Sequence, residues 1–301
     1  LWFGRNGVWY NSSWGTTGNP AGGSNATVSG INTTKTYLAC ASFYNGSGKF
    51  NFGQKPFKFP PPDGFQPLNA ANIRPVKVIS RPDQYVDVRS GLSAQFTISD
   101  LNFETNLMIA KSTSNDEYWI WADSVRGFIG GLRSNDTNAQ GSGLAIANVN
   151  SNGYQSDSNW FTNGRTYVTY SFKAGGSKNT FNVDDVGYAS AAAAGLDAGV
   201  VTPSAASVGT KQGFSILKYS GTGGQSCSHG LTQAPEFIIE KEIGNSTAWT
   251  VQTTVIDGSL DYLYLNTTAQ ANDYNVDAPT STVFDIGRNS ECIAYLWHSV
   301  P

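Results

Sequence analysis

The sequence predicts an all-β protein made of tandem antiparallel β-sandwich modules. Three observations predict this fold class. Short apolar runs recur about every 8 to 12 residues, Gly, Asn, Asp and Ser separate them, and no long stretch has helical periodicity. Of 301 residues, 33 are Gly, 32 Ser, 26 Thr and 26 Asn, which is typical of a chain with many turns. The 38 aromatic residues are enough to fill the cores of several modules.

Charge and hydropathy exclude several other classes of protein. Only 14% of the residues are charged, and the formal net charge is −3. Domains that bind nucleic acid generally carry a basic surface, so we expect no nucleic-acid partner. No apolar run approaches the roughly 18 residues of a membrane-spanning helix, so we expect no membrane insertion.

The first expected module is part of a β-sandwich at residues 1–57. Residues 1–4 have the pattern of a strand interior, and residues 50–53 alternate as a second strand does. Because the numbering begins inside a strand pattern, we expect the chain to be a piece of a longer protein. A Pro-rich linker follows at residues 58–75, since the prolines at positions 60–62 cannot donate to a sheet ladder.

An internal repeat organises the rest of the chain. Residues 107–111 (LMIAK) match residues 237–241 (FIIEK) at an offset of 130, and residues 167–172 match residues 293–298 at an offset of 126. An ordered series of matches at a near-constant offset is the signature of a duplicated domain. We therefore predict two repeated β-sandwich domains, at residues 76–174 and 213–301.

Residues 175–212 are expected to be an Ala/Gly-rich linker between the two repeats. Within them, residues 189–194 (ASAAAA) are expected to form one or two helical turns that Gly195 closes. The other residues of this segment are small and polar, which is typical of an ordered connector.

Few residues offer catalytic chemistry. The two histidines, His229 and His298, lie in no G-x-S-x-G elbow, so we predict no serine nucleophile. Glycosidases hold two carboxylates about 5 to 10 Å apart. The carboxylate pairs of this chain are interpreted as solvated charges in loops or at strand edges: Asp116 with Glu117, Asp184 with Asp185, and Glu240 with Glu242.

No metal or cofactor is expected either. Asp184 and Asp185 are the candidate cation ligands, but the sequence shows no spacing that supplies the six to eight oxygens of a Ca²⁺ site. We therefore predict no catalytic residue, no metal site and no cofactor.

Two aromatic residues near the start of the chain, Tyr10 and Trp14, are the expected ligand-binding positions. They lie among Asn, Ser and Gly, where ring faces are available to stack on sugars. Rigid aromatic side chains give a large contact area at a small entropic cost, which suits a binding surface.

Several motifs resemble known families. Residues 1–9 (LWFGRNGVW) resemble the strand of SPRY domains in which an aromatic residue precedes x-N-G-x-W, and residues 50–57 (FNFGQKPF) resemble the SPRY closing strand. Residues 1–57 thus resemble the C-terminal half of a SPRY domain. The remainder resembles an uncharacterised repeat that follows SPRY in virion proteins of tailed phages, marine ones especially, through stretches such as 123–127 (DSVRG) and 264–268 (YLNTT).

The resemblance implies a non-enzymatic structural protein of the virion, a tail fibre or spike component at the particle surface. The implied partners are other virion proteins, further copies of the chain with a trimer as the expected form, and host surface glycan. Two alternatives stay open: a capsid decoration or head-fibre protein, and a lectin-like receptor binder. A glycan depolymerase is not expected, because the sequence shows no parallel β-helix pattern.

Overall fold

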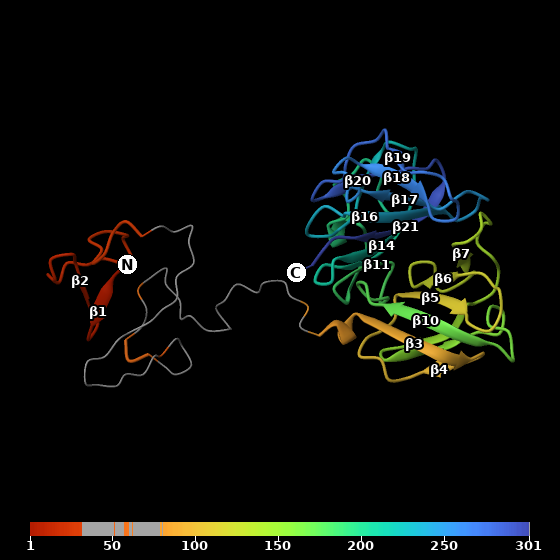
Figure 1. Cartoon of the computed structure of the whole chain (residues 1–301), viewed down its shortest axis with the longest axis horizontal. Coiled ribbons are helices and arrows are strands. Elements are labelled where there is room, and N and C mark those ends of the chain that lie inside the picture. Colours follow the sequence, from red (N-terminus) through yellow and green to blue (C-terminus); the bar gives the residue numbers. More distant parts are fainter. Residues whose placement is uncertain (32–50, 52–56, 60–61, 63–78, 80, 301) are drawn as a thin grey trace. The chain divides into compact units, whose positions relative to one another are not determined.

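The computed structural model describes residues 1–31, 51, 57–59, 62, 79 and 81–300 (Figure 1). The chain forms two compact units, Leu1–Val76 and Lys77–Pro301. Within the described part of the chain, helix is confined to two 3-10 turns, η1 (Pro82–Gln84) and η2 (Ala192–Ala194), and the sheets are almost entirely antiparallel. The expected all-β sandwich class is confirmed.

The described part of the first unit contains one β-hairpin. Strands β1 (Phe3–Arg5) and β2 (Val8–Tyr10) pair across Asn6 and Gly7, whose φ angles are 53° and 80°. Positive φ at both turn residues is the type I′ geometry that Asn-Gly favours. The second expected strand of this module lies largely outside the described residues, so its resemblance to half of a SPRY domain stays a prediction.

The first repeat of the second unit is built on a five-stranded sheet in the order β3-β10-β5-β6-β7. A smaller sheet in the order β4-β9-β8 covers one of its faces and closes an apolar core around Phe96, Tyr154 and Phe161. The strands of this repeat are β3 (Val86–Ser93), β4 (Thr97–Ile98), β5 (Leu107–Ser112), β6 (Ile120–Asp123), β7 (Leu132–Arg133), β8 (Ile146–Asn150), β9 (Gly153–Ser156) and β10 (Thr166–Phe172).

The second repeat has the same strand order within a nine-stranded sheet. The segment β14-β21-β16-β17-β18 corresponds strand by strand to β3-β10-β5-β6-β7, and the pair β15-β20 corresponds to β4-β9. In Figure 1 this repeat (teal to blue) lies above the first (orange to green). Its strands are β14 (Phe214–Ser220), β15 (Ser226–Ser228), β16 (Phe237–Glu242), β17 (Thr250–Thr253), β18 (Asp261–Tyr264), β19 (Asn272–Asp273), β20 (Val283–Asp285) and β21 (Glu291–Trp297).

The strand registers fix the correspondence between the repeats. Leu107 pairs with Phe172 in the first repeat, and Phe237 pairs with Trp297 in the second. The last strands are therefore offset by 125 residues, and the offset of 126 expected from the sequence is wrong by one position. The turn after Trp119 is repeated as well, because Asn135 and Asn266 each accept the backbone N–H of the matching tryptophan.

The expectation of a linker at residues 175–212 is wrong. Strands β11 (Phe181–Val183), β12 (Val186–Tyr188) and β13 (Ala205–Gly209) extend the nine-stranded sheet, in the order β12-β11-β13-β14. Ala206, Val208 and Leu196 are buried in the core of the second sandwich. At Gly175 a side chain would collide with the backbone of Val208, so part of this segment has to be small, and a low content of large apolar residues does not mark a connector. The expected helical turn is confirmed: η2 is followed by Gly195 as its C-cap, with φ 70°.

The large sheets of the two repeats pack against each other. Their facing sides form a shared core that includes Leu107 and Trp121 from the first sheet and Trp249, Val251 and Tyr295 from the second. Trp121 lies 5.3 Å from Trp249 and 5.1 Å from Tyr295 between ring centroids. The two repeats are therefore layers of one compact unit rather than separate beads.

A buried polar network lies in this shared core. Asp123, which is fully buried, accepts hydrogen bonds from Arg126 Nε at 2.7 Å and from the Tyr295 hydroxyl at 2.7 Å. Arg126 also donates to the carbonyls of Gly130 and Trp121. Pairing and hydrogen bonding offset the cost of burying these charges, and the bond from Tyr295 to Asp123 joins the two repeats directly.

In the part of the chain that the structure describes, no helix is both long and apolar enough to cross a membrane.

Candidate functional site

An open pocket lies at the β17-β18-β19 edge of the nine-stranded sheet. Its volume is about 410 Å³, which falls within the range of small-molecule sites. Strands β17, β18 and β19, the residues directly after β19 and the loop after β20 supply its lining: Thr250, Tyr262, Tyr264, Asp273, Tyr274, Asn275, Gly287 and Arg288.

Three tyrosines form the aromatic part of this pocket. Tyr262 and Tyr264 are two residues apart on β18, so the period of a strand places both on the same face of the sheet. The ring centroid of Tyr262 lies 5.7 Å from that of Tyr264 and 5.1 Å from that of Tyr274. All three side chains are only partly buried, so ring surface is available to a ligand.

The opposite wall of the pocket is the loop at Gly287 and Arg288. The Arg288 guanidinium donates to the carbonyl of Ala248 at 2.9 Å and to the Thr250 hydroxyl, which holds the loop against β17. The Gly287 N–H donates to Glu240 at 3.1 and 3.2 Å to the two carboxylate oxygens.

Glu240 is a fully buried carboxyl group behind this wall. It accepts hydrogen bonds from the Tyr219 hydroxyl and from Gln252 Nε2 at 2.6 Å, in addition to Gly287. Burial raises the pKa of Glu240 above its ordinary value. Desolvation, and after it the negative charge of Glu240, raises the pKa of Tyr274 to about 12. Tyr274 therefore stays a neutral hydrogen-bond donor at all physiological pH values.

The interpretation of Glu240 and Glu242 as solvated charges is wrong. Glu240, Lys241 and Glu242 are all buried on the central strand β16. Lys241 Nζ donates to the carbonyls of Glu242 and Asn245, both at 2.8 Å, and Glu242 accepts from Asn245 Nδ2 at 2.7 Å. Each charged group has local partners, which allows a charged tripeptide to occupy a strand that is central in the sheet.

The first repeat has a second pocket at the corresponding place. Ile120 pairs with Arg133 as Thr250 pairs with Tyr264, and each of these pairs lines the pocket of its own repeat. The second pocket has a volume of about 370 Å³. Its lining comprises Asp116, Glu117, Tyr118, Ile120, Arg133, Asn159, Trp160, Thr162 and Arg165.

This second pocket also combines aromatic and polar side chains. The Arg133 guanidinium lies 4.2 Å from the ring centroid of Tyr118 and 5.3 Å from that of Trp160, which are cation–π distances. Glu117 pairs with Arg165 and accepts from the Tyr167 hydroxyl at 3.0 Å. Glu117 is thus already engaged by two protein donors.

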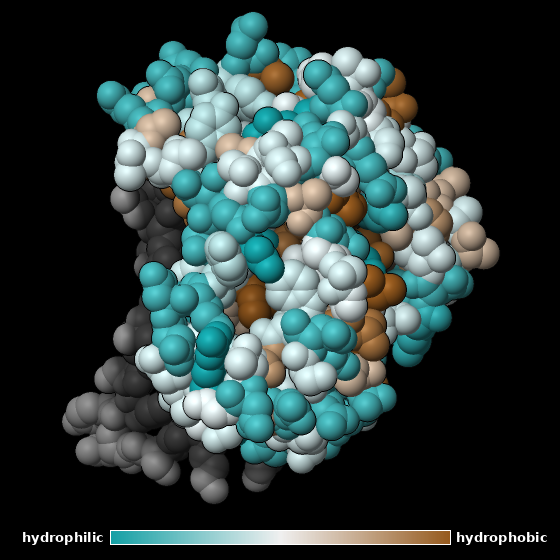
Figure 2. All heavy atoms as spheres, turned by 90° about the vertical axis from the view of Figure 1, so that its right-hand side faces the viewer, coloured by the Kyte–Doolittle hydropathy of each residue, from teal (hydrophilic) through white to brown (hydrophobic). Residues whose placement is uncertain are grey.

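A third cavity of about 420 Å³ differs from both pockets because its lining is mostly apolar. Residues from both repeats line it, among them Ile109, Tyr170 and Leu265. Figure 2 shows hydrophobic residues gathered in a hollow near the middle of one face of the molecule. The shared core therefore reaches the surface where the facing sheets end.

The expected ligand-binding residues Tyr10 and Trp14 lie together in the first unit. Their ring centroids are 6.2 Å apart, and Trp14 also stacks on Phe3 at 6.4 Å. Trp14 is 68% exposed and Tyr10 is partly buried. A role in ligand binding remains a prediction for both residues.

The other residues considered from the sequence have structural partners. His229 accepts the Leu231 N–H at 3.0 Å, and burial lowers its pKa, so it is a neutral turn residue. Asp184 accepts the Thr210 N–H at 2.9 Å, and Asp185 pairs with Lys173 at 2.6 Å. Both aspartates have positive φ and form the turn between β11 and β12.

Sequence reasoning did not find either pocket. The only local signal in the second repeat is the alternation Tyr262-x-Tyr264 followed by Tyr274, because alternating aromatic residues at a strand end mark one face. The walls come from loops that follow β9 and β20, and only the paired registers bring them to the sheet edge.

Comparison with known proteins gives one match. The model of a family described as a domain of unknown function (DUF7483) matches residues 82–301. No curated protein and no solved structure matches the chain.

Proposed function

The chain belongs to the family of the domain of unknown function DUF7483, and we propose that it is a non-enzymatic binding module of a virion surface whose two repeats hold carbohydrate. One observation carries the proposal. Both repeats have an open pocket of aromatic and polar side chains at the same place on the sheet. A pocket retained at the same place in two diverged copies is more readily explained by binding than by packing.

The chemistry of the linings favours sugars over other ligands. Partly exposed Tyr262 and Tyr264 offer ring faces that bury the C–H side of a pyranose, as rigid aromatic residues do at other binding surfaces. Asp273 and Asn275 place polar groups beside the rings, where they can bond hydroxyl groups. The two linings share few residue types, so we expect different sugar preferences for the two repeats.

Binding without catalysis is supported by the state of the nearby carboxylates. Glu240 lies behind Gly287 and is held by three groups of the protein, and Glu117 is held by Arg165 and Tyr167. A general acid and a base or nucleophile must both reach the scissile bond. Neither of these carboxylates is free to do so, which leaves one carboxylate among the described residues that line each pocket, Asp273 or Asp116, where the reaction needs two.

The virion location is supported by the resemblance of the second unit to a repeat that follows SPRY in virion proteins of tailed phages, together with the SPRY-like pattern of residues 1–57. The packing of the two repeats into one unit suits a fibre, spike or capsid decoration, because its pockets keep a fixed spacing. Mass spectrometry of purified particles tests this part of the proposal. We expect the chain in the particles, and finding it only in the lysate would contradict a virion role.

A glycan array probed with the intact chain tests carbohydrate binding. We expect binding to at least one sugar, and Tyr264→Ala or Tyr118→Ala should lower the affinity by about tenfold, since one aromatic stacking contact contributes about 1 kcal/mol or more. Tyr188→Ala, on the far edge strand of the same sheet, is the matched control and should bind as the parent chain does.

Two results would overturn the carbohydrate proposal. One is an array on which the intact, folded chain binds no glycan. The other is unchanged binding by the double variant of Tyr264 and Tyr118, which would place the sugar elsewhere.

A further inference from the structure

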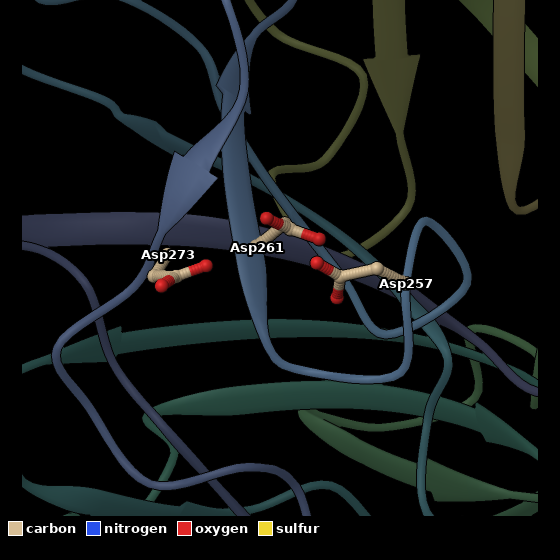
Figure 3. Close-up of side chains that lie close together, drawn as sticks. All are labelled: Asp257, Asp261 and Asp273. Atoms are coloured by element: carbon tan, nitrogen blue, oxygen red, sulfur yellow. The ribbon is translucent and has the colours of Figure 1, made fainter.

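Three aspartates meet at the outer edge of the nine-stranded sheet. Asp257 lies in the loop before β18, Asp261 begins β18 and Asp273 ends β19. One carboxylate oxygen from each lies within 4.8 Å of the other two, and Figure 3 shows the three groups pointing toward one another. None of the ion pairs formed by the described residues involves any of them.

Asp261 is the buried member of this cluster, and one of its carboxylate oxygens has no partner among the described residues. Its residue is only 4% exposed, and its Oδ2 atom is buried without any hydrogen-bond partner. A buried carboxylate oxygen without a donor is costly, and nearly all such groups in proteins are satisfied by a donor, a water or a cation.

The strand register gives an independent reason to expect a cation between these aspartates. Asp261 pairs directly with Asp273 across β18 and β19. Like charges directly opposite each other on neighbouring strands destabilise a sheet. A cation between them converts this repulsion into attraction.

We propose that Asp257, Asp261 and Asp273 bind a divalent cation of the calcium class. The donors are all oxygen atoms, which select hard cations over zinc, copper or iron. Calcium–oxygen distances of about 2.3 to 2.6 Å allow two ligands of one ion to be up to about 5 Å apart, so the three carboxylates can share one ion. The ion needs further oxygens, which water supplies.

The local sequence supports a calcium loop. Residues 257–261 read Asp-Gly-Ser-Leu-Asp, in which oxygen-bearing side chains alternate as they do at the start of EF-hand loops. Ser259 donates from its N–H and its hydroxyl to Asp257 Oδ1, at 2.9 and 2.7 Å. Gly258 has φ 100°, which lets this loop turn back toward the sheet.

The site would also order the tyrosine pocket. Asp273 lines that pocket and precedes Tyr274, and Asp261 precedes Tyr262 on the same strand. Binding of the cation would fix β18, on which Tyr262 lies, and the end of β19, which directly precedes Tyr274. The metal site itself does not depend on carbohydrate binding, so either can fail without the other.

Calorimetric titration of the chelator-treated chain with CaCl₂ tests this site. We expect one calcium ion per chain and a higher Tm in calcium than in EDTA. Asp261→Asn should weaken calcium binding by about tenfold or more, because affinity follows the number of charged ligands. Asp277→Asn, an exposed aspartate in the same repeat, is the matched control and should bind calcium normally.

The behaviour in EDTA separates a ligand role from a structural one. Without calcium, Asp261→Asn should have a Tm equal to or above that of the parent chain, since it removes a like-charge contact. Asp257→Asn, whose residue is exposed, gives the same affinity readout if the Asp261 variant does not fold. Failure of the parent chain to bind calcium, or equal calcium affinity in the Asp261, Asp257 and Asp277 variants, would overturn the proposal, and so would tighter binding of magnesium than of calcium.

Discussion

Several buried charged residues of this protein have hydrogen-bond partners close to them in space. Asp123 is buried with Arg126 and Tyr295, and Glu240 is buried with a tyrosine, a glutamine and a backbone N–H. None of these pairings can be read from the sequence, because the partners lie 12 to 172 residues apart along the chain except for Arg126. The sequence therefore gives no sign that Glu240 and Glu242 are buried, and it favours their interpretation as solvated charges.

Lys241 gives a pH-dependent prediction. Burial lowers its pKa from 10.5 to about 8 in the folded chain. Between about pH 8 and pH 10.5 the unfolded chain therefore holds more protons at this residue, so its contribution to the free energy of unfolding rises with pH.

Urea unfolding of the parent chain and of Lys241→Met isolates this effect. From pH 7.5 to pH 10, we expect the parent to gain about 2 kcal/mol relative to the variant, following 1.36 kcal/mol per pKa unit. A difference that stays constant over this range would show that Lys241 is not desolvated in the folded state.

At the scale of strands, the sequence predicted most of what the structure shows. The pattern at residues 107–111 and 167–172 predicted strands β5 and β10, and the repeat predicted their partners β16 and β21. Hydrophobic alternation involves only neighbouring residues, so the sequence alone shows it. Strand β13 was missed because its residues (AASVG) are mostly small and carry no such alternation, and β11 was missed because an alternation of only three residues (FNV) is too short to mark a strand.

The facing sheets give a prediction that contrasts two equivalent tryptophans. Trp249 is fully buried in the shared core and donates to the Arg133 carbonyl at 2.8 Å, whereas the corresponding Trp119 is partly exposed. Trp249→Phe removes volume from the shared core and the indole donor to the Arg133 carbonyl, so it should cost about 2 to 4 kcal/mol of stability.

Trp119→Phe is the matched control and should cost about 1 kcal/mol or less, since the replaced ring is partly in solvent. Chemical denaturation of both variants measures the difference. Equal losses would mean that the two sheets do not depend on each other through this contact.

At the scale of the whole molecule, the second unit is a duplicated sandwich whose halves share a core. The duplication was visible in the sequence, but the face-to-face packing was not, because it depends on which sheet face each strand presents to the other repeat. The same limit applies to the pockets and to the aspartate cluster. Each is formed by strand ends and loops that only the register brings together.

We propose above all that carbohydrate binds in the equivalent pockets of the two repeats. A crystal structure of the chain with a glycan selected from an array tests this binding most directly. We predict a sugar ring against Tyr262, Tyr264 and Tyr274, or against Tyr118 and Trp160 in the first repeat. A bound sugar found only at another surface, such as Tyr10 and Trp14, would contradict the claim.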